Sequence, residues 1–460
     1  MKKNLITLAL LFFITTAAIA QDTLKFSKKQ VSDDISFLFK NAADIHPYLN
    51  HKVSVNQLSK KVDSLVATLP DSLSTIMAFR AFATATAFID EGHTSINIPK
   101  WIRNDIKSGK FKGIPLKVDD YSENCFSASI AGTNNDISKI KVRSINGKSA
   151  ESIFEAMVAL RGGLLSLRKI NALRSFRFYL SAIGIHQPYT INYTDQQTGS
   201  AKTAIVNEIS EQDYLAAIAK PADTRSYTFA ILDKNYGYLN FKEMRDYDRF
   251  VIFCDSVFRV IDQNHLNKLV IDLRENGGGN SGLGRYLLNY LSDKPYRMAG
   301  GAERKVSQQF KDQIQSPANK QLYQNSGLDE YLKMQNGSFL EFEADNLEPP
   351  ADIPNKFKGK VCFLIGPYTF SSANMLAATI KDFKIATLIG EPTGEPANDY
   401  GEVCSIKLPQ TGLVAFTSTT LWIRPNGNKA DSKPIEPDYF IERKTAEDNV
   451  LKFSLNWLDK

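Results

Sequence analysis

One serine stands where the chain changes from an apolar strand to an amphipathic helix. Residues 361–365 are apolar, a turn follows, and a helical pattern runs from Ser371 to Phe383. Ser371 is therefore expected at a helix N-terminus, where free backbone N–H groups and the helix dipole stabilise a developing negative charge. A serine that attacks a carbonyl group needs such an environment, although a serine that only caps the helix would show the same pattern.

A glycine-rich turn could supply the hydrogen-bond donors that acyl transfer requires. Three consecutive glycines, 277–279, follow an apolar strand at 269–273. Glycine lets backbone N–H groups come close to a ligand, which suits donors arranged around an oxyanion. A plain strand-to-helix turn is the alternative, and the phosphate-loop pattern G-x-x-x-x-G-K-[ST] is absent. Asp272 and Arg274, beside this turn, are expected to be structural.

His93 is the candidate general base among five histidines. It lies on a charged, glycine-containing corner between a helix and a strand, and functional groups are often found on such loops. His46 is expected to cap or to pack, and His265 to lie at a helix end, where a positive charge is mildly favoured. No cluster of Cys and His has the spacing of metal ligands, so we expect neither a metal nor another cofactor.

The elements that must position these residues fall into regions of different pattern. Helical periodicity dominates residues 27–89, short strands and one helix fill 110–220, and strands alternate with helices from 227 onward. Such alternation favours a layered α/β core. Residues 301–350 are polar and irregular, which predicts a surface insertion or lid. The expected domains are a signal peptide at 1–20, a helical domain at 21–105, a small β-rich module with a PDZ-like stretch at 106–222, and a core at 223–460.

The first residues are typical of an exported protein. Lys2 and Lys3 precede an uncharged stretch at 5–20, which ends in Ala18-Ile19-Ala20. A basic start, a short apolar run and small residues at an A-x-A site predict a cleavable secretory signal. The apolar run is shorter than the ~20 residues of a membrane-spanning helix. We therefore expect a chain starting near Gln21, without an integral span, in the periplasm or outside the cell.

Composition narrows the remaining classes. The chain is 43% hydrophobic and 23% charged, and its formal charge of +6 falls to +4 without the two signal lysines. This is ordinary for a globular protein and shows no dense basic patch, so a nucleic-acid partner is not expected. An even number of cysteines permits disulfides in an exported protein, but their wide spacing and apolar surroundings favour buried free thiols. The cysteines are Cys125, Cys254, Cys362 and Cys404.

Two near-motifs are set aside. Residues 408–412 spell LPQTG, a sortase signal, but no apolar span with a basic tail follows, so an edge strand and turn are expected there. The pattern G-x-S-x-G does not occur, which counts against an α/β-hydrolase esterase.

Five stretches together resemble the tail-specific and tricorn-core serine peptidases. They read DEGHT at 90–94, DLRENGGG at 272–279, TFSSA at 369–373, LIGEPTG at 388–394 and DSKPIEPD at 431–438, in the same order as in that family. The fourth matches the strand and turn that follow the family's nucleophile. The fifth matches the closing segment of the tricorn-like branch.

The resemblance implies a crotonase-like (ClpP-like) layered core and a serine peptidase that acts on peptides or proteins. Residue by residue, it implies that Ser371 is the nucleophile and His93 the general base. Asp431 stands where the tricorn-like branch has a glutamate that orients the histidine. The N–H groups of Gly278 and Ser372 match the family's oxyanion hole.

The sequence also departs from the family pattern. Residues 393–396 read TGEP where the other branch carries the lysine of a Ser–Lys dyad, which favours a Ser–His pair here. Gly92 replaces a serine before the histidine, and Asn374 replaces a glutamate after the nucleophile. These changes leave open an alternative, a catalytically weak or inactive protein on the same fold that binds peptides or hydrophobic ligands.

Overall fold

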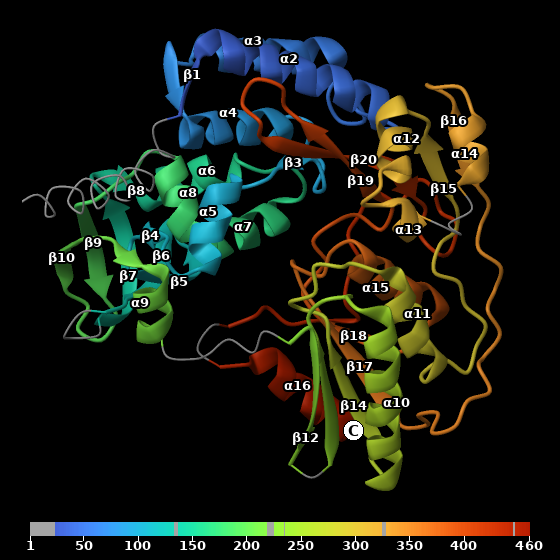
Figure 1. Ribbon diagram of the computed structural model, residues 1–460. Coiled ribbons are helices and arrows are strands. Elements are labelled where there is room, and N and C mark those ends of the chain that lie inside the picture. Colours follow the sequence, from blue (N-terminus) through green and yellow to red (C-terminus); the bar gives the residue numbers. More distant parts are fainter. Residues whose placement is uncertain (1–23, 133–136, 219–224, 234, 324–327, 445–446) are drawn as a thin grey trace, which may run out of the picture.

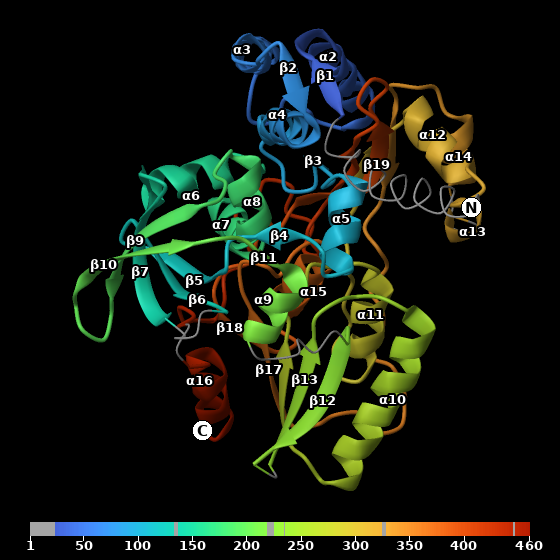
Figure 2. The same cartoon turned by 60° about the vertical axis from the view of Figure 1, so that its left-hand side comes forward.

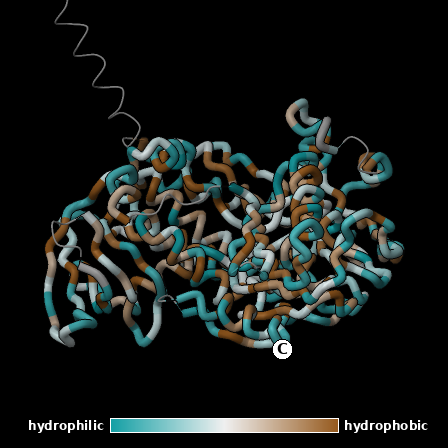
Figure 3. Tube along the Cα trace, turned by 90° about the horizontal axis from the view of Figure 1, so that it is seen from below, coloured by the Kyte–Doolittle hydropathy of each residue, from teal (hydrophilic) through white to brown (hydrophobic). Residues whose placement is uncertain are grey.

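The computed structural model describes residues 24–132, 137–218, 225–233, 235–323, 328–444 and 447–460. The predicted signal peptide at 1–20 lies outside these ranges. Figure 1 shows N-terminal helices and a β-rich module beside a C-terminal core. In the described ranges, no helix combines the length and the apolar character needed to cross a membrane, and Figure 3 shows hydrophobic and hydrophilic stretches interleaved along the chain.

The N-terminal region is helical, as the sequence predicts. Ser27 and Ser54 each begin a helix with a capping box, in which the serine side chain accepts from a backbone N–H three residues on. Phe79 and Phe82 are buried on the third helix. The elements are β1 (Lys25–Ser27), α2 (Lys28–Ile45), α3 (Val55–Ala67), β2 (Ser72–Ser74) and α4 (Thr75–Ala87).

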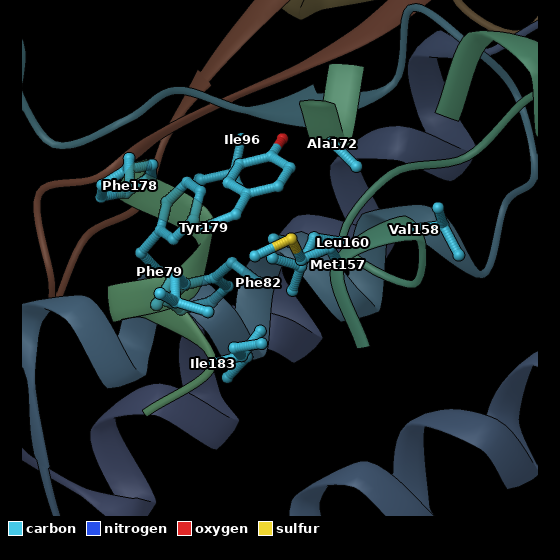
Figure 4. Packing of buried hydrophobic residues seen from close by; sticks show 14 of the residues in the cluster. Phe79, Phe82, Ile96, Met157, Val158, Leu160, Ala172, Phe178, Tyr179 and Ile183 are labelled. Carbon is cyan, nitrogen blue, oxygen red and sulfur yellow. The ribbon is translucent and has the colours of Figure 1, made fainter. Parts of the chain in front are cut away.

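The middle region folds around an antiparallel sheet in the order β10-β9-β7-β6-β5. Figure 4 shows Met157 and Phe178 from this region packed with Phe79 and Phe82, so the N-terminal helices and the β-rich module share one hydrophobic cluster. The elements are β3 (Ser95–Ile96), α5 (Lys100–Lys107), β4 (Lys112–Gly113), β5 (Leu116–Ser122), β6 (Cys125–Ile130), β7 (Ile137–Ile145), β8 (Lys148–Ser149), α6 (Ala150–Val158), α7 (Leu165–Arg174), α8 (Phe176–Ala182), β9 (Tyr189–Asp195), β10 (Ala201–Val206), β11 (Ile209–Ser210) and α9 (Glu211–Ala217).

The core is a six-stranded sheet in the order β12-β13-β14-β17-β18-β21. Strands β13 to β21 are parallel and β12 is antiparallel to β13. Figure 2 shows α10 and α11 on one side of this sheet and α16 on the other. The elements are β12 (Tyr227–Leu232), β13 (Tyr236–Phe241), α10 (Tyr247–Gln263), β14 (Lys268–Asp272), α11 (Ser281–Asn289), β17 (Lys360–Ile365), α15 (Ser372–Phe383), β18 (Thr387–Gly390), β21 (Tyr439–Phe440) and α16 (Asn449–Leu458).

This arrangement confirms the predicted layered α/β core. Strands β14 and β17 are apolar on both faces, since helices cover both faces of the sheet. Successive residues of each strand belong in turn to the hydrophobic cluster on one face and to the cluster on the other. Parallel strands bring their carboxyl ends to one edge of the sheet, where ligands commonly bind in open α/β folds. The glycine turn after β14 and the serine turn after β17 are therefore neighbours.

A second sheet, in the order β16-β15-β20-β19 with β3 added to β20, joins the core to the N-terminal regions. The prediction of an irregular insertion at 301–350 is wrong, because β15 pairs with β20 from far along the chain and Phe310 and Tyr331 are fully buried. Residues 408–412 form the turn between β19 and β20. The elements are β15 (Ala302–Lys305), α12 (Gln308–Gln315), α13 (Lys320–Tyr323), α14 (Asp329–Lys333), β16 (Phe339–Phe342), β19 (Asp399–Lys407) and β20 (Val414–Trp422).

All four cysteines are free and buried, which confirms the prediction of free thiols. Burial raises the pKa of the Cys362 thiol to about 12 and that of Cys404 likewise. Both therefore behave as packing residues rather than as nucleophiles.

Candidate active site

Ser371 occupies a strained backbone position at the start of α15. Its φ of 56° and ψ of −128° are unusual for a residue other than glycine, and its side chain makes no capping hydrogen bond. The turn is fixed by Thr369, whose hydroxyl accepts from Gly366 N–H at 3.0 Å and donates to the Leu273 carbonyl at 2.9 Å. Strain of this kind costs about 1–3 kcal/mol and collects at functional sites. The Ser371 hydroxyl is thus held at the turn without a capping role.

The glycine turn presses against this serine. A Cβ added to Gly278 would lie 2.7 Å from Ser371 Cβ and 3.0 Å from Ser372 N, so only glycine fits there. The φ of Gly278, 93°, also requires glycine. Residues nearly a hundred positions apart in the sequence thus meet at the start of α15.

Only half of the predicted oxyanion hole presents a free donor. The Ser372 N–H makes no hydrogen bond within the described part of the chain, and its hydroxyl donates to the Gly279 carbonyl at 2.7 Å. The Gly278 N–H, however, donates to Asn276 Oδ1 at 2.9 Å. The Gly278 N–H would have to leave Asn276 before it could bind an oxyanion.

The loop that carries His93 is held by the side chain of Glu91. This buried carboxylate accepts hydrogen bonds from the N–H of His93, from the N–H of Thr94 at 2.7 Å and from the Thr94 hydroxyl at 2.6 Å. Gly162 packs directly on the corner, since a Cβ there would lie 2.8 Å from Glu91 backbone atoms. The middle region therefore helps to shape the loop that presents the imidazole.

The His93 ring lies over the residue that precedes the nucleophile. Its centroid is 4.4 Å from the ring centroid of Phe370. Gly92 is required here, because a Cβ at that position would lie 2.8 Å from Phe370 Cε2. The replacement of the family's serine by glycine is thus matched to a phenylalanine that fills the space.

Two carboxyl groups face the Nδ1 atom of His93. Glu91 Oε1 lies 3.4 Å from it and Glu395 Oε2 lies 3.7 Å from it. The other oxygen of Glu395 accepts a hydrogen bond from the Ser371 N–H. Ser371 and His93 both lie in the described part of the chain, and no hydrogen bond joins the Ser371 hydroxyl to the His93 ring. The Glu395 carboxyl group contacts both residues instead.

The two carboxyl groups differ in charge. Burial alone would raise the pKa of Glu91, but the contacts with His93, His46 and Thr94 lower it to about 2, so Glu91 is ionised. Burial raises the pKa of Glu395 well above its usual range, and its hydrogen-bonded neighbour Asp399 raises it further. At neutral pH the pair at His93 is therefore one carboxylate and one carboxylic acid.

Asn374 lies behind this pair. Its amide group is fully buried and donates to the Pro396 carbonyl at 2.8 Å and to Asp399 Oδ2 at 3.4 Å. Burial raises the pKa of Asp399, while the hydrogen bond from Glu395 and the nearby His93 lower it. The resulting pKa is about 6. The family's glutamate at position 374 would add a further carboxylate to this cluster, so asparagine fits the observed charges.

Asp431 does not take the place that the sequence predicted. Its carboxylate pairs with Arg424 and accepts the Lys433 N–H at 3.0 Å. Arg424 also pairs with Asp382 near the end of α15, so Asp431 is held by a cation rather than by the imidazole. The carboxyl groups beside the imidazole are those of Glu91 and Glu395 instead, so the assignment of Asp431 as the orienting residue is corrected.

Sequence reasoning missed Glu91, Glu395 and Asp399. Glu91 stands two positions before His93, a spacing at which a side chain can reach the following backbone N–H groups, and this signal was available. Glu395 lies on the loop after β18 and Asp399 begins β19, and only the fold reveals that both reach His93. Where the dyad branch has its lysine, this chain has a turn that brings an acid to the serine.

Asp272 and Arg274 are structural, as predicted. Arg274 Nη2 lies 2.6 Å from Asp272 Oδ2, and Arg274 Nη1 lies 2.8 Å from Asp448 Oδ1. Asp448 caps α16, so the buried guanidinium ties the end of β14 to the C-terminal helix. On α15, Lys381 pairs with Asp438. Within the described ranges, no group of His, Cys, Asp and Glu side chains could hold a metal ion.

Known proteins resemble this chain in sequence pattern and in fold. Residues 235–441 match the family model of Peptidase family S41, and no curated protein sequence matches the chain. Among solved structures, a mutant of CPAF is 14% identical with a TM-score of 0.68, covering 94% of this chain and 96% of that chain. Mature CPAF complexed with lactacystin is 14% identical with a TM-score of 0.64, covering 94% of this chain and 97% of that chain.

At these identities the solved structures show a shared fold, and that fold extends over nearly the whole chain rather than the core alone. The matched family region contains Ser371, the glycine turn and the Glu395 loop. Through residues 235–441, this chain is similar to peptidase family S41, and the match supports a serine-type peptidase.

Proposed function

We propose that this serine peptidase is exported and cleaves peptide bonds through an acyl-enzyme on Ser371, with His93 as the general base. The observation that carries the proposal is the convergence of three distant segments on the strained serine. The glycine turn touches Ser371, Phe370 packs against His93, and the Glu395 carboxyl group contacts both Ser371 and His93. A nucleophile, a base and an orienting group within reach of one another are the parts that acyl transfer requires.

The reaction follows from these roles. The Ser371 oxygen attacks the peptide carbonyl while its proton passes to the His93 ring, and the Glu91 carboxylate stabilises the imidazolium that forms. The oxyanion lies at the Ser372 N–H and, once Asn276 releases it, at the Gly278 N–H. Collapse of the intermediate breaks the C–N bond, and the leaving amine takes the proton from His93. Water, activated by the same imidazole, then hydrolyses the acyl ester.

A fluorophosphonate probe tests the nucleophile directly. We expect the probe to label the wild-type chain. Ser371→Ala and His93→Ala should both be labelled much more slowly than the wild type. Lys381→Ala is the matched control on α15, because Lys381 pairs with Asp438 and takes no part in this scheme. If the folded wild-type protein is not labelled, or if Lys381→Ala removes labelling, the proposed mechanism is wrong.

Export is proposed from the sequence of residues 1–20. Expression with the native N-terminus in a Gram-negative host, followed by N-terminal sequencing of the released protein, is expected to show a chain starting near Gln21. Retention of Met1 on a cytoplasmic protein would contradict export.

A second candidate is a weakly active or inactive binding protein on the same fold. It is favoured by the engaged Gly278 N–H and by the missing hydrogen bond between the Ser371 hydroxyl and His93. The labelling experiment separates the two, since a binding protein would bind peptides without forming an adduct at Ser371.

A further inference from the structure

The loop between α6 and α7, at residues 159–164, brings the middle region against the corner that carries the proposed base. Two consecutive glycines allow this approach. A Cβ on Gly162 would lie 2.8 Å from backbone atoms of Glu91. A Cβ on Gly163 would lie 3.1 Å from Gly92 Cα. Side chains at these two positions would push the loop off the corner, so the glycines keep the two backbones in direct contact.

From this loop, one charged donor reaches a single peptide unit of the corner. Arg161 Nη2 donates to the Gly92 carbonyl at 2.9 Å. At the other end of the same peptide unit, the His93 N–H donates to the Glu91 carboxylate. The peptide unit that joins Gly92 to His93 is therefore held at both ends. Because a hydrogen bond to a carbonyl strengthens the N–H of the same amide as a donor, the two contacts reinforce each other.

The charge of Arg161 is not taken up by a carboxylate. Among the residues that the structure describes, this half-buried guanidinium forms no ion pair, and its Nε–H is buried without a hydrogen-bond partner. The Gly92 carbonyl is its hydrogen-bond acceptor there. A hydrogen bond from a charged donor is roughly twice as strong as one between neutral groups. The main polar contact of this guanidinium is therefore the peptide unit next to His93.

Packing on both sides fixes the loop that carries the arginine. Figure 4 shows Leu160, directly before it, and Ala172 of α7 in the hydrophobic cluster shared with the N-terminal helices. Leu167, on the first turn of α7, is buried. Its two methyl carbons lie 3.2 Å from where a Cβ on Gly92 or on Gly394 would stand, so this leucine fills the space between the corner and the loop after β18. A donor on such a support holds its acceptor in one place.

We propose that Arg161 is a positioning residue of the active site, which orients the His93 imidazole by holding the peptide unit before it. The inference rests on the proposed function for its effect on turnover. Without the guanidinium, this peptide unit keeps only the contact at its N–H and can rotate, which moves the ring away from its place against Phe370. A misplacement of about 1 Å in a reacting group can cost on the order of a hundredfold in rate. The middle region thus contributes to catalysis although the nucleophile and the base lie outside it.

Arg161→Ala and Arg168→Ala form a matched pair. Arg168 is also half-buried, and its Nε–H donates to the Val158 carbonyl at 2.7 Å, a contact that stays within the middle region. In peptide hydrolysis we expect the kcat of Arg161→Ala to fall roughly ten- to a hundredfold, with KM within about threefold of wild type. Arg168→Ala should keep kcat and KM within about threefold. Equal kcat values in the two variants, both folded by circular dichroism, would overturn the proposal.

Chemical rescue distinguishes a positioning role from a general loss of stability. Guanidinium ions, at concentrations well below those that denature the wild type, should raise the activity of Arg161→Ala by occupying the half-buried space of the missing side chain. Urea has a similar planar shape but no charge, so an equal concentration should restore much less. Guanidinium should leave the activity of Arg168→Ala unchanged. An impaired Arg161→Ala that guanidinium does not rescue, or that urea rescues equally well, would refute the assignment.

Nuclear magnetic resonance of the histidine rings tests their positions without turnover. The chain has five histidines, so selective isotope labelling of the imidazoles gives few signals, and His93→Ala assigns the one that is needed. We expect the His93 signal to shift or broaden in Arg161→Ala and to stay unchanged in Arg168→Ala. If it does so but no fluorophosphonate labels the wild type, the positioning role stands and the proposed function fails. If the wild type is labelled, and Arg161→Ala changes neither the His93 signal nor the labelling rate, the proposed function stands and the positioning role fails.

Discussion

The charge of Glu91 is expected to control the reactivity of His93, and Glu91→Gln removes that charge with little change in shape. Glu91 is ionised and lies 3.4 Å from Nδ1, on the side of the ring away from the proton that the base must accept. A glutamine oxygen can still accept the Thr94 N–H and hydroxyl, but its NH₂ group then faces the His93 N–H. The variant therefore removes the charge together with one hydrogen bond of the loop, and the folding controls below check the loop.

The magnitude follows from the geometry. Unit charges 3.4 Å apart interact by about 5 kcal/mol at an effective dielectric constant near 20. The amide dipole of glutamine recovers part of this, which leaves a loss of about 2–4 kcal/mol in stabilising the imidazolium. Because each 1.36 kcal/mol is tenfold in rate, kcat/KM is expected to fall roughly 30- to 900-fold.

Glu395→Gln is the matched control. Glu395 contacts the same nitrogen, but burial and Asp399 keep it protonated, so glutamine replaces a neutral acid with a neutral amide. Its oxygen can still accept the Ser371 N–H, and its NH₂ group can donate to Asp399. We expect kcat/KM within about threefold of wild type, the scale of one uncharged hydrogen bond.

The assay is steady-state hydrolysis of a fluorogenic peptide across pH 5–9, with the fluorophosphonate labelling rate as a second readout. Circular dichroism and urea denaturation show whether each variant is folded. If Glu395→Gln is the severely impaired variant and Glu91→Gln the mild one, Glu395 is the ionised partner of His93. The reasoning from burial and charge would then be wrong.

Three further outcomes are expected. Gly278→Ala should abolish turnover because the new Cβ would lie 2.7 Å from Ser371 Cβ. Gly412 also has a positive φ but lies in open space, so Gly412→Ala should keep activity and cost only about 1–2 kcal/mol of unfolding free energy. An equal loss of activity in both variants would contradict this. His46→Asn should flatten the pH dependence of the unfolding free energy measured by urea denaturation. The shift of the His46 pKa from 6.5 to about 4 contributes about 3 kcal/mol, which is fully present above pH 6.5 and is lost as pH falls through 4. An unchanged pH dependence would show that His46 is not buried in its neutral form. Arg274→Met should lower the unfolding free energy by about 3–5 kcal/mol, since it leaves Asp272 buried without its cation, and a loss below about 1 kcal/mol in the same titration would exclude that role.

Local pattern was sufficient for the core elements. The predicted strand at 361–365 and helix from Ser371 correspond to β17 and α15, because a buried parallel strand is continuously apolar and a covering helix has an apolar stripe. The glycine run was identified for the same reason: a strand end that must approach another backbone closely leaves no room for a Cβ. These signals are local and need no knowledge of the partner.

Residues 301–350 show where local pattern fails. Their strands are short and their outward positions are polar, so no periodicity marks them. β15 pairs with β20, more than a hundred positions away, and Tyr331 is buried against residues of other elements such as Phe310. The assignment of Asp431 as the orienting residue was wrong for a related reason. Its position in a motif gave no information about Arg424, the cation that pairs with it.

The sequence by itself determined the family resemblance, the place of Ser371 at the start of a helix, the glycine turn and the loop that carries His93, because each is written in residues close together along the chain. Only the tertiary structure decided which carboxyl groups face the imidazole and which of them is charged. Those answers depend on burial and on distances between segments remote in sequence: Glu91 keeps its charge because His93, His46 and Thr94 surround it, and Glu395 is neutral because the fold buries it against Asp399.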